Sequence, residues 1–309
     1  LHRYLRLKQR MLGVEKLKYS DVYAPVVQKM DRQYSVEEAK KLILAAVEPM
    51  GPEYAEVVRR AFAGRWIDIY PTAGKQSGAY SSGSAYDVHP YILMNYNERY
   101  DDVRTLMHEL GHTLHSYYAN QTQPYATADY SLFVAEVAST FNEALLMNRM
   151  LAEIQEVEMR LSLLMNYVEG VRQTVFRQSQ FAEFELRMHE TAERGEPLTG
   201  EILSRMYGEI LKKYYGHELG VCEIDDLYCI EWAFIPHFYR HYYVYQYATS
   251  FTASTMLAER VLKQEAGAVE KYIELISAGG SDYPVNLLQK AGVDMTTSAP
   301  FAATMQAMN

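Results

Sequence analysis

Most of the chain shows the spacing of apolar residues that is typical of amphipathic α-helices. In SVEEAKKLILAAV, residues 35–47, Ser35 and Glu38 have capping-box spacing and are followed by apolar residues at helical intervals. Residues 154–194 contain almost no Gly or Pro and keep recurring Leu, Met, Val and Phe, which predicts one or two long helices. Residues 199–216, TGEILSRMYGEILKKYYG, predict another helix that stops at a glycine.

A stretch of about thirty residues breaks this helical pattern. RWIDIYP, residues 65–71, alternates in the manner of a strand, and YILMNY, residues 91–96, is a short β-prone run. Between them, residues 72–87 are rich in Gly and Ser and predict loops and turns. No internal repeat, low-complexity linker or domain boundary is visible. The pattern therefore predicts a mainly α fold with a small sheet inserted in a helical body, as one domain over residues 1–309.

The composition narrows the classes of partner. With 49% hydrophobic and 22% charged residues, it is that of an ordinary soluble globular protein. The formal net charge of −9 argues against a nucleic-acid binder and against attachment to anionic membrane surfaces. No apolar run approaches the roughly 20 residues needed to span a bilayer, and no signal-peptide pattern opens the chain. We therefore expect neither nucleic acid nor a membrane among the partners.

The two cysteines and the first residues give two further expectations. Cys222 and Cys229 form neither a disulfide framework nor a paired metal-binding motif. Two unpaired core thiols in a reducing cytosol are favoured over one bridge between them, so we expect a cytoplasmic protein. The chain begins with Leu1, and LHRYLRLKQRML, residues 1–12, has the pattern of a helix interior. We therefore expect this sequence to be a segment of a longer protein.

The segment TLMHELGHTLHS, residues 105–116, contains three of the nine histidines of the chain. It follows the start of a predicted helix near residue 101 or 102. His108 and His112 are four residues apart and project from one helix face, where two imidazoles can bind the same zinc ion. Glu109 lies beside them, where a carboxylate can act as general base on a water molecule. The segment therefore predicts a catalytic zinc helix, and a histidine-rich polar face is the alternative.

A third zinc ligand is sought on the next predicted helix, residues 129–151. This helix is largely apolar, but Glu136 and Glu143 interrupt it seven residues apart and thus on one face. Buried carboxylates are costly unless they are paired or bind a metal. We expect Glu136 to be the third ligand and Glu143 to orient an imidazole through a hydrogen bond. A solvated stripe on an amphipathic helix is the alternative.

These motifs together resemble those of a known family. HELGHTLH followed by FVAEVASTFNE is similar to the zinc oligopeptidases related to thimet oligopeptidase, and most closely to the bacterial oligoendopeptidase F branch. The segments GRWIDIYPTAGKQSGAYSSG, HPYILMNY, IPHFYRHYYVYQYATSF and GGSDYPVNLLQKAGVDM also resemble that branch, so the likeness spans nearly the whole chain. The resemblance implies a zincin-like helical catalytic domain with a small β-sheet beside the active-site helix.

The resemblance also implies roles for particular residues. His108, His112 and Glu136 match the family's ligands of Zn²⁺, and Glu109 matches its general base. Family members are usually about twice as long, with an N-terminal helical domain that forms the other wall of a deep substrate channel. That domain is expected as a partner of this chain, and this chain is expected to be the C-terminal catalytic portion.

The segment PHFYRHYYVYQYATSF, residues 236–251, is rich in tyrosine. Hydrolysis of a peptide at zinc builds negative charge on the carbonyl oxygen, which phenol O–H donors can stabilise. On a helix, His237, His241 and Tyr245 lie along one face and Tyr242 lies close to it. The resemblance implies His237 and Tyr245 as transition-state donors, with Tyr242 as a weaker third. Core packing is favoured for the remaining tyrosines of the segment, which are Tyr239, Tyr243 and Tyr247.

The glycine-rich loop of residues 74–83 lacks the G-K-[ST] ending of a phosphate-binding loop. A better use is main-chain pairing with an extended peptide, and GAYS, residues 78–81, is the candidate for that contact. Together these features predict a zinc endopeptidase that hydrolyses short unfolded oligopeptides. One alternative is a non-catalytic zinc-binding helical segment of a larger assembly. Another is a zincin carboxypeptidase, which would need a cationic group for the substrate carboxylate.

Overall fold

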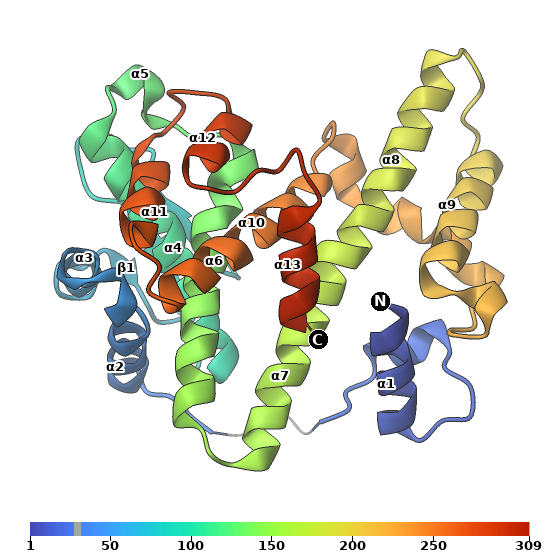
Figure 1. The fold of residues 1–309 in the computed structure, drawn as a ribbon, viewed down its shortest axis with the longest axis horizontal. Coiled ribbons are helices and arrows are strands. Elements are labelled where there is room, and N and C mark those ends of the chain that lie inside the picture. Colours follow the sequence, from blue (N-terminus) through green and yellow to red (C-terminus); the bar gives the residue numbers. More distant parts are fainter. Residues whose placement is uncertain (28–31, 309) are drawn as a thin grey trace. The chain divides into compact units, whose positions relative to one another are not determined.

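The computed structural model describes residues 1–27 and 32–308. It is mainly helical, with one small sheet among these residues, so the predicted fold class is confirmed. The chain forms two compact units: unit 1 contains Leu1–Lys29 and Leu164–Ala248, and unit 2 contains Met30–Leu163 and Thr249–Asn309. At two places the chain passes from one unit to the other in the middle of a helix. These helices are α7 (Val157–Val171) and α10 (Tyr245–Leu262). Figure 1 shows the α-helices, coloured along the sequence.

Unit 2 holds the sheet, and most of its remaining residues are helical. Its helices other than α7 and α10 are α2 (Val36–Ala46), η2 (Glu48–Met50), α3 (Pro52–Ala63), α4 (Tyr100–Thr122), α5 (Tyr125–Ala128), α6 (Leu132–Glu153), α11 (Ala268–Ser277), α12 (Pro284–Lys290) and α13 (Ala299–Met308). The predicted capping box of α2 is present, since the Ser35 hydroxyl accepts the Glu38 N–H and the Glu38 carboxylate accepts the Ser35 N–H. Both α6 and the distant α11 pack against α4, and Figure 1 shows α11 in orange-red beside α4 in blue-green.

The start of α4 is fixed by a side chain in its first turn. The Asp102 carboxylate accepts the backbone N–H groups of Arg99 at 2.9 Å and Asn97 at 3.1 Å, which satisfies donors ahead of the first helical turn. A negative charge there also interacts favourably with the helix dipole. The helix then buries one apolar stripe in the core of unit 2, formed by Val103, Leu106, Leu110 and Leu114.

The sheet contains β1 (Ile67–Asp68), β2 (Tyr80–Ser82) and β3 (Tyr91–Leu93) in the order β1–β3–β2. β1 runs parallel to β3 and β2 runs antiparallel to it, so β2 forms an edge of the sheet. β1 and β3 lie in the runs predicted as strands, but β2 lies in the run predicted as loop. That prediction is wrong for three residues, because a strand this short pairs through its main chain and needs no alternating apolar pattern.

Unit 1 holds the first helix of the chain, the helices that follow α7, and several short helical turns. Its elements other than α7 and α10 are α1 (His2–Leu12), η1 (Tyr19–Tyr23), the π-helical turn η3 (Arg172–Phe176), α8 (Arg177–Glu193), α9 (Gly200–Tyr215), η4 (His217–Leu219), η5 (Asp226–Phe234) and η6 (Pro236–Tyr239). The predicted α9 is confirmed with both ends: Thr199 accepts the Ile202 N–H, and Gly216 ends the helix with a φ of 66°. None of the helices among residues 1–27 and 32–308 is long and apolar enough to cross a membrane.

The long stretch predicted over residues 154–194 is confirmed as two helices, α7 and α8, which meet at the π-helical turn η3. A buried arginine in η3 makes hydrogen bonds to residues of α7 and α9. Arg172 is fully buried and donates hydrogen bonds to the Glu169 carboxylate and to the Tyr215 hydroxyl. Its guanidinium needs these acceptors, since an unpaired buried charge would strongly destabilise unit 1.

The tyrosine-rich segment differs from the helix on which its predicted geometry depended. η6 ends at Tyr239, residues 240–244 are irregular, and α10 begins only at Tyr245. Tyr242 has a φ of 49°, in the left-handed region that interrupts helical continuation. His237, His241 and Tyr245 therefore do not share one helix face, and that part of the sequence argument is wrong.

Candidate metal centre

The structure brings the three predicted metal ligands together in unit 2. His108 Nε2 lies 3.2 Å from His112 Nε2, and Glu136 Oε2 lies 3.4 Å from His108 Nε2 and 3.5 Å from His112 Nε2. Ligands that bind one tetrahedral zinc ion through bonds of roughly 2.0–2.1 Å are separated by about 3.3 Å. The three atoms therefore fit one zinc ion, and no fourth His, Cys, Asp or Glu of the described residues joins the group. Among the described residues this is the only such group of three metal-binding side chains.

A glycine inside the histidine motif permits this approach of α4 to α6. A β-carbon on Gly111 would lie 2.5 Å from the Ala138 carbonyl oxygen and 2.5 Å from the Ser139 Cα. Real β-carbons do not come this close to backbone atoms, so any larger residue would push the two helices apart. Gly111 thus allows the two histidines of α4 to reach Glu136 of α6.

Two further side chains orient the ligands. Glu143 Oε1 lies 2.6 Å from His108 Nδ1, and its other oxygen accepts a hydrogen bond from Arg104 at 2.9 Å. The Ser139 hydroxyl donates to Glu136 Oε2 at 2.8 Å. Contacts of this kind fix the ring tautomer and the orientation of metal ligands. The contact of Glu143 with His108 is the one expected from the sequence. The roles of Arg104 and Ser139 were not predicted. Their only signal in the sequence is helical spacing, since Arg104 lies four residues before His108 and Ser139 three residues after Glu136.

The electrostatics of Glu136 favour its ionised form. Burial opposes ionisation, but a hydrogen bond with His112 and the charges of both histidines outweigh it and lower the pKa of Glu136 to about 2. An ionised carboxylate between two imidazoles is a suitable set of donors for a divalent cation with nitrogen and oxygen ligands.

Glu109 has a different environment from Glu136. It is only 7% exposed, and burial raises its pKa above the ordinary value, while the neighbouring His108 and His112 and the Ser81 backbone act in the opposite direction. A carboxylate in such surroundings holds a proton more readily than one in water, which suits general acid–base chemistry. Its side chain is not one of the three clustered ligands.

The third histidine of the motif, His115, has a structural environment. It is buried, and its ring stacks on Tyr130 with centroids 3.5 Å apart and planes at 8°. Burial lowers the pKa of His115 to about 3, so the imidazole is neutral at physiological pH. The histidine-rich segment therefore combines two candidate ligands with one stacked core histidine.

The edge strand β2 lies along α4, as we expect for the GAYS segment. The Ser81 and Thr113 hydroxyls are 2.8 Å apart, and Asn120 donates to the Gly83 carbonyl at 3.1 Å. Gly83 also has no room for a β-carbon, which would lie 2.2 Å from the Ser116 Cβ. The sheet is therefore beside the helix that carries the histidines, and pairing of residues 78–81 with a substrate stays a prediction.

The predicted oxyanion donors His237, Tyr242 and Tyr245 belong to unit 1, so their role at the metal group of unit 2 stays a prediction. His237 stacks on Tyr243 with ring centroids 5.6 Å apart. Tyr243 and Tyr247 are half-buried, which agrees only in part with the predicted packing in the core. Tyr239 is 89% exposed, so that prediction is wrong for Tyr239. Its neighbour Phe238 makes the packing contacts there, with Phe181 and Phe184 of α8.

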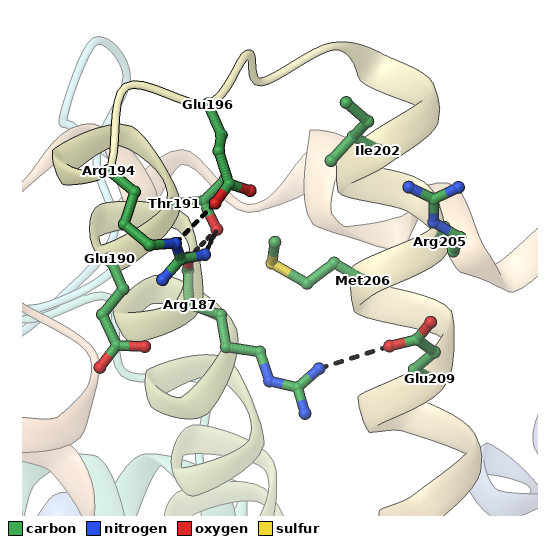
Figure 2. A pocket seen from close by; sticks show the side chains of 9 residues that line it. All are labelled: Arg187, Glu190, Thr191, Arg194, Glu196, Ile202, Arg205, Met206 and Glu209. Carbon is green, nitrogen blue, oxygen red and sulfur yellow. Dashed lines mark hydrogen bonds and ion pairs between the residues drawn. The ribbon is translucent and has the colours of Figure 1, made fainter.

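Within the described residues, neither the two cysteines nor the cleft of unit 1 described next forms a second metal centre. Cys222 is buried, Cys229 is half-buried, and both are free thiols, as expected. A cleft of about 400 Å³ lies between α8 and α9 in unit 1, where three arginines are balanced by three glutamates (Figure 2). Arg194 pairs with Glu196 at 2.7 Å and Arg187 with Glu209 at 3.4 Å. The balanced charges select no particular ligand, and none of the predicted site residues lines this cleft.

Comparison with known sequences gives a consistent result. The sequence model of peptidase family M3 matches residues 1–307. The chain is 46% identical to oligopeptidase PepF of Bacillus subtilis over 303 residues, which cover 98% of this chain and 45% of that protein. It is 45% identical to an oligoendopeptidase F homologue of Lactococcus lactis over 298 residues, covering 96% of this chain and 49% of that protein. The chain thus spans about half the length of the curated relatives that it matches.

Solved structures give the same picture of the fold. A Chlamydophila abortus structure described as a peptidase is similar with a TM-score of 0.90 and 41% identity, over 99% of this chain and 50% of that one. Oligoendopeptidase F from Enterococcus faecium is similar with a TM-score of 0.75 and 38% identity, over 99% of this chain and 47% of that one. The likeness to the oligoendopeptidase F branch that the sequence suggests is confirmed.

Proposed function

This chain belongs to peptidase family M3, and on that premise we propose that it is the catalytic portion of a zinc-dependent endopeptidase acting on short unfolded oligopeptides. The observation that carries the proposal is the spacing of His108, His112 and Glu136, whose ligand atoms lie 3.2–3.5 Å apart. Three protein ligands with an open fourth position are typical of catalytic rather than structural zinc. Bound there, zinc would polarise the scissile carbonyl and lower the pKa of a water molecule.

Glu109 is proposed as the general base. It would take a proton from the attacking water and deliver it to the nitrogen of the leaving amine, so that one carboxylate serves both halves of the reaction. Its burial supports this role, because the raised pKa narrows the gap between holding and releasing the proton at neutral pH. A purely structural metal would need no such neighbour.

His237 and Tyr245, with Tyr242 as a weaker third, are proposed to donate hydrogen bonds to the oxyanion of the tetrahedral intermediate. The support is chemical and comes from sequence likeness: O–H and ring N–H groups in a tyrosine-rich segment suit a developing negative charge. Residues 78–81 are proposed to bind the substrate main chain, supported by the edge position of β2 beside α4. The cytoplasmic location stays a prediction that rests on the two free thiols.

The alternatives are a non-catalytic zinc-binding segment and a carboxypeptidase. The experiment uses the complete chain of the protein, since the relatives are about twice as long as this sequence. A peptide blocked at both termini is incubated with the zinc-loaded protein, with the chelated protein and with chelated protein to which zinc is restored. We expect internal cleavage that chelation abolishes and zinc restores. Zinc binding without cleavage of any peptide would support the non-catalytic alternative, and cleavage only of peptides with a free carboxyl terminus would support a carboxypeptidase.

A further inference from the structure

One face of α8 holds the tyrosine-rich segment in place within unit 1. Phe238 packs edge-on against Phe181 and Phe184 of α8, with ring centroids 5.6 Å and 5.3 Å apart. Four residues further along the segment, the Tyr242 ring stacks on His189 with centroids 4.6 Å apart and planes at 26°. Residues 181, 185 and 189 of α8 follow one another at intervals of four, which places them along one side of the helix.

Between these two aromatic contacts lies a hydrogen bond from the backbone. The Tyr242 N–H donates to Glu185 Oε1 of α8 at 2.8 Å. Tyr242 has a φ of 49°, a conformation that is uncommon for a bulky side chain and persists only where surrounding contacts enforce it. Tyr242 lies in the irregular residues 240–244 that precede α10. The helix begins three residues after it, at Tyr245. Glu185 therefore stabilises the conformation that sets where α10 starts.

Glu185 is an unusual residue for this position. It is 1% exposed, its Oε2 atom is buried and has no hydrogen-bond partner, and burial raises its pKa. His189 of α8 and His241 of the segment are the titratable groups whose charges act on it. Burial of a carboxylate with one oxygen unpaired costs stability, a cost that a neutral Gln accepting the same N–H would carry only in part. Strained backbone such as that of Tyr242, with its φ of 49°, is concentrated at functional sites, where surrounding contacts enforce it.

The helix that carries Glu185 packs against α9 within unit 1, and two ion pairs join the two helices. Arg187 of α8 reaches Glu209 of α9 at 3.4 Å, a contact that Figure 2 shows across the cleft, and Lys213 of α9 pairs with Glu183 of α8 at 3.1 Å. The residues that contact the turn at Tyr242 therefore lie on a helix that is packed against a second helix. A site built on a supported helix places its groups more accurately than one built on a loop.

We propose that Glu185 is a positioning residue for the reaction: by holding the Tyr242 N–H it sets the start of α10 and thereby the place of the Tyr245 hydroxyl. This inference rests on the proposed function, in which Tyr245 donates to the oxyanion. In this role Glu185 acts through the turn at Tyr242 and not by contact with the substrate. A displacement of about 1 Å at a donor can cost about 10²-fold in turnover, which sets the size of the expected effect.

The test uses the complete zinc-loaded protein and compares Glu185→Leu with Glu185→Gln. Leucine removes the acceptor, whereas glutamine keeps a carbonyl oxygen for the Tyr242 N–H and removes the charge. We expect Glu185→Leu to lower kcat by about 10²-fold with KM and zinc content nearly unchanged, and Glu185→Gln to retain kcat. Glu190→Leu is the matched control, because Glu190 is an exposed carboxylate on the same helix. That control should leave kcat unchanged.

Coupling to Tyr245 separates positioning from general damage. In a Tyr245→Phe background the donor is gone, so the further loss from Glu185→Leu should nearly vanish. Equal losses in both backgrounds, or an unchanged kcat in Glu185→Leu, would overturn the inference while the endopeptidase proposal stands. Failure of the unsubstituted protein to cleave any peptide would instead overturn the proposed function. If Glu185→Leu does not fold, Glu185→Asp shortens the reach to Tyr242 with its charge retained and should lower kcat in the same coupled way.

Discussion

Gly111 of α4 lies against Ser139 of α6 so closely that a β-carbon on the glycine would come within 2.5 Å of the Ser139 Cα. This close packing of α4 on α6 allows His108 and His112 of α4 to lie within metal-binding distance of Glu136 of α6. It also explains a residue of the motif HELGH that plays no direct part in the chemistry.

Replacement of Gly111 by alanine should weaken zinc binding and destabilise unit 2. The methyl group cannot be accommodated by moving a side chain, because its neighbours are backbone atoms, and overpacking of this kind costs about 1–3 kcal/mol. Thermal unfolding with and without zinc measures both effects. Gly170→Ala in α7 is the control, since no atom beyond the neighbouring backbone of its own helix lies within 4 Å of the place its methyl group would take, and alanine favours a helix. Equal unfolding temperatures for the two variants would contradict this explanation.

Removal of Glu136 tests the third ligand. Alanine at this position reduces the protein ligands from three to two, so zinc affinity should fall sharply while the apolar core of α6 is unaffected. Competition with a chromophoric chelator measures the affinity. Full zinc occupancy at limiting zinc would assign the third place to another residue, and Glu143 would be the first to examine.

Glu143 should affect the metal without binding it. Its carboxylate lies 2.6 Å from His108 Nδ1, and loss of such an orienting partner typically costs 10- to 100-fold in metal affinity or activity. We expect Glu143→Ala to lower zinc affinity by about that factor, and Arg104→Leu to have a smaller effect in the same direction. Should Glu143→Ala bind zinc as tightly as the unsubstituted protein, the contact would be only structural.

Glu109 separates an enzyme from a metal-binding scaffold. Glutamine keeps the size of the side chain and most of its hydrogen bonding but cannot accept a proton at neutral pH. We expect zinc content and peptide affinity to persist and kcat to fall by about 10²–10⁴-fold. All three quantities are measured on one purified sample of the complete chain, so that loss of metal cannot be mistaken for loss of the base. Normal zinc with near-normal kcat would rule out this mechanism.

Tyr245 provides the test of the oxyanion donors. Phenylalanine keeps the ring and removes only the O–H group, so folding should survive. Loss of one oxyanion donor is worth about 10²–10³-fold in turnover, with little change in KM. Tyr239→Phe is the control, because Tyr239 is 89% exposed and has no proposed role. An unchanged kcat in Tyr245→Phe would move the donor role to His237 or Tyr242.

Much of this protein is determined by local sequence. The i, i+4 spacing of His108 and His112 and the seven-residue spacing of the two glutamates of α6 follow from helical periodicity alone. Capping residues and glycine stops act within one turn, which is why the start of α4 and both ends of α2 and α9 are close to those predicted. Chemistry that is concentrated on one or two regular helices can therefore be predicted from the order of residues.

Other features were decided only by tertiary structure. The chain passes from one unit to the other inside α7 and again inside α10. Helical periodicity continues through both places, so no linker sequence marks these two unit boundaries. The turn at Tyr242 depends on the Glu185 carboxylate, which is 57 residues away in sequence. Likewise, the closeness of α4 to α6 depends on which backbone atoms face Gly111. Contacts between distant segments leave no periodic signal in the sequence, because their geometry is fixed by packing and not by the spacing of neighbouring residues.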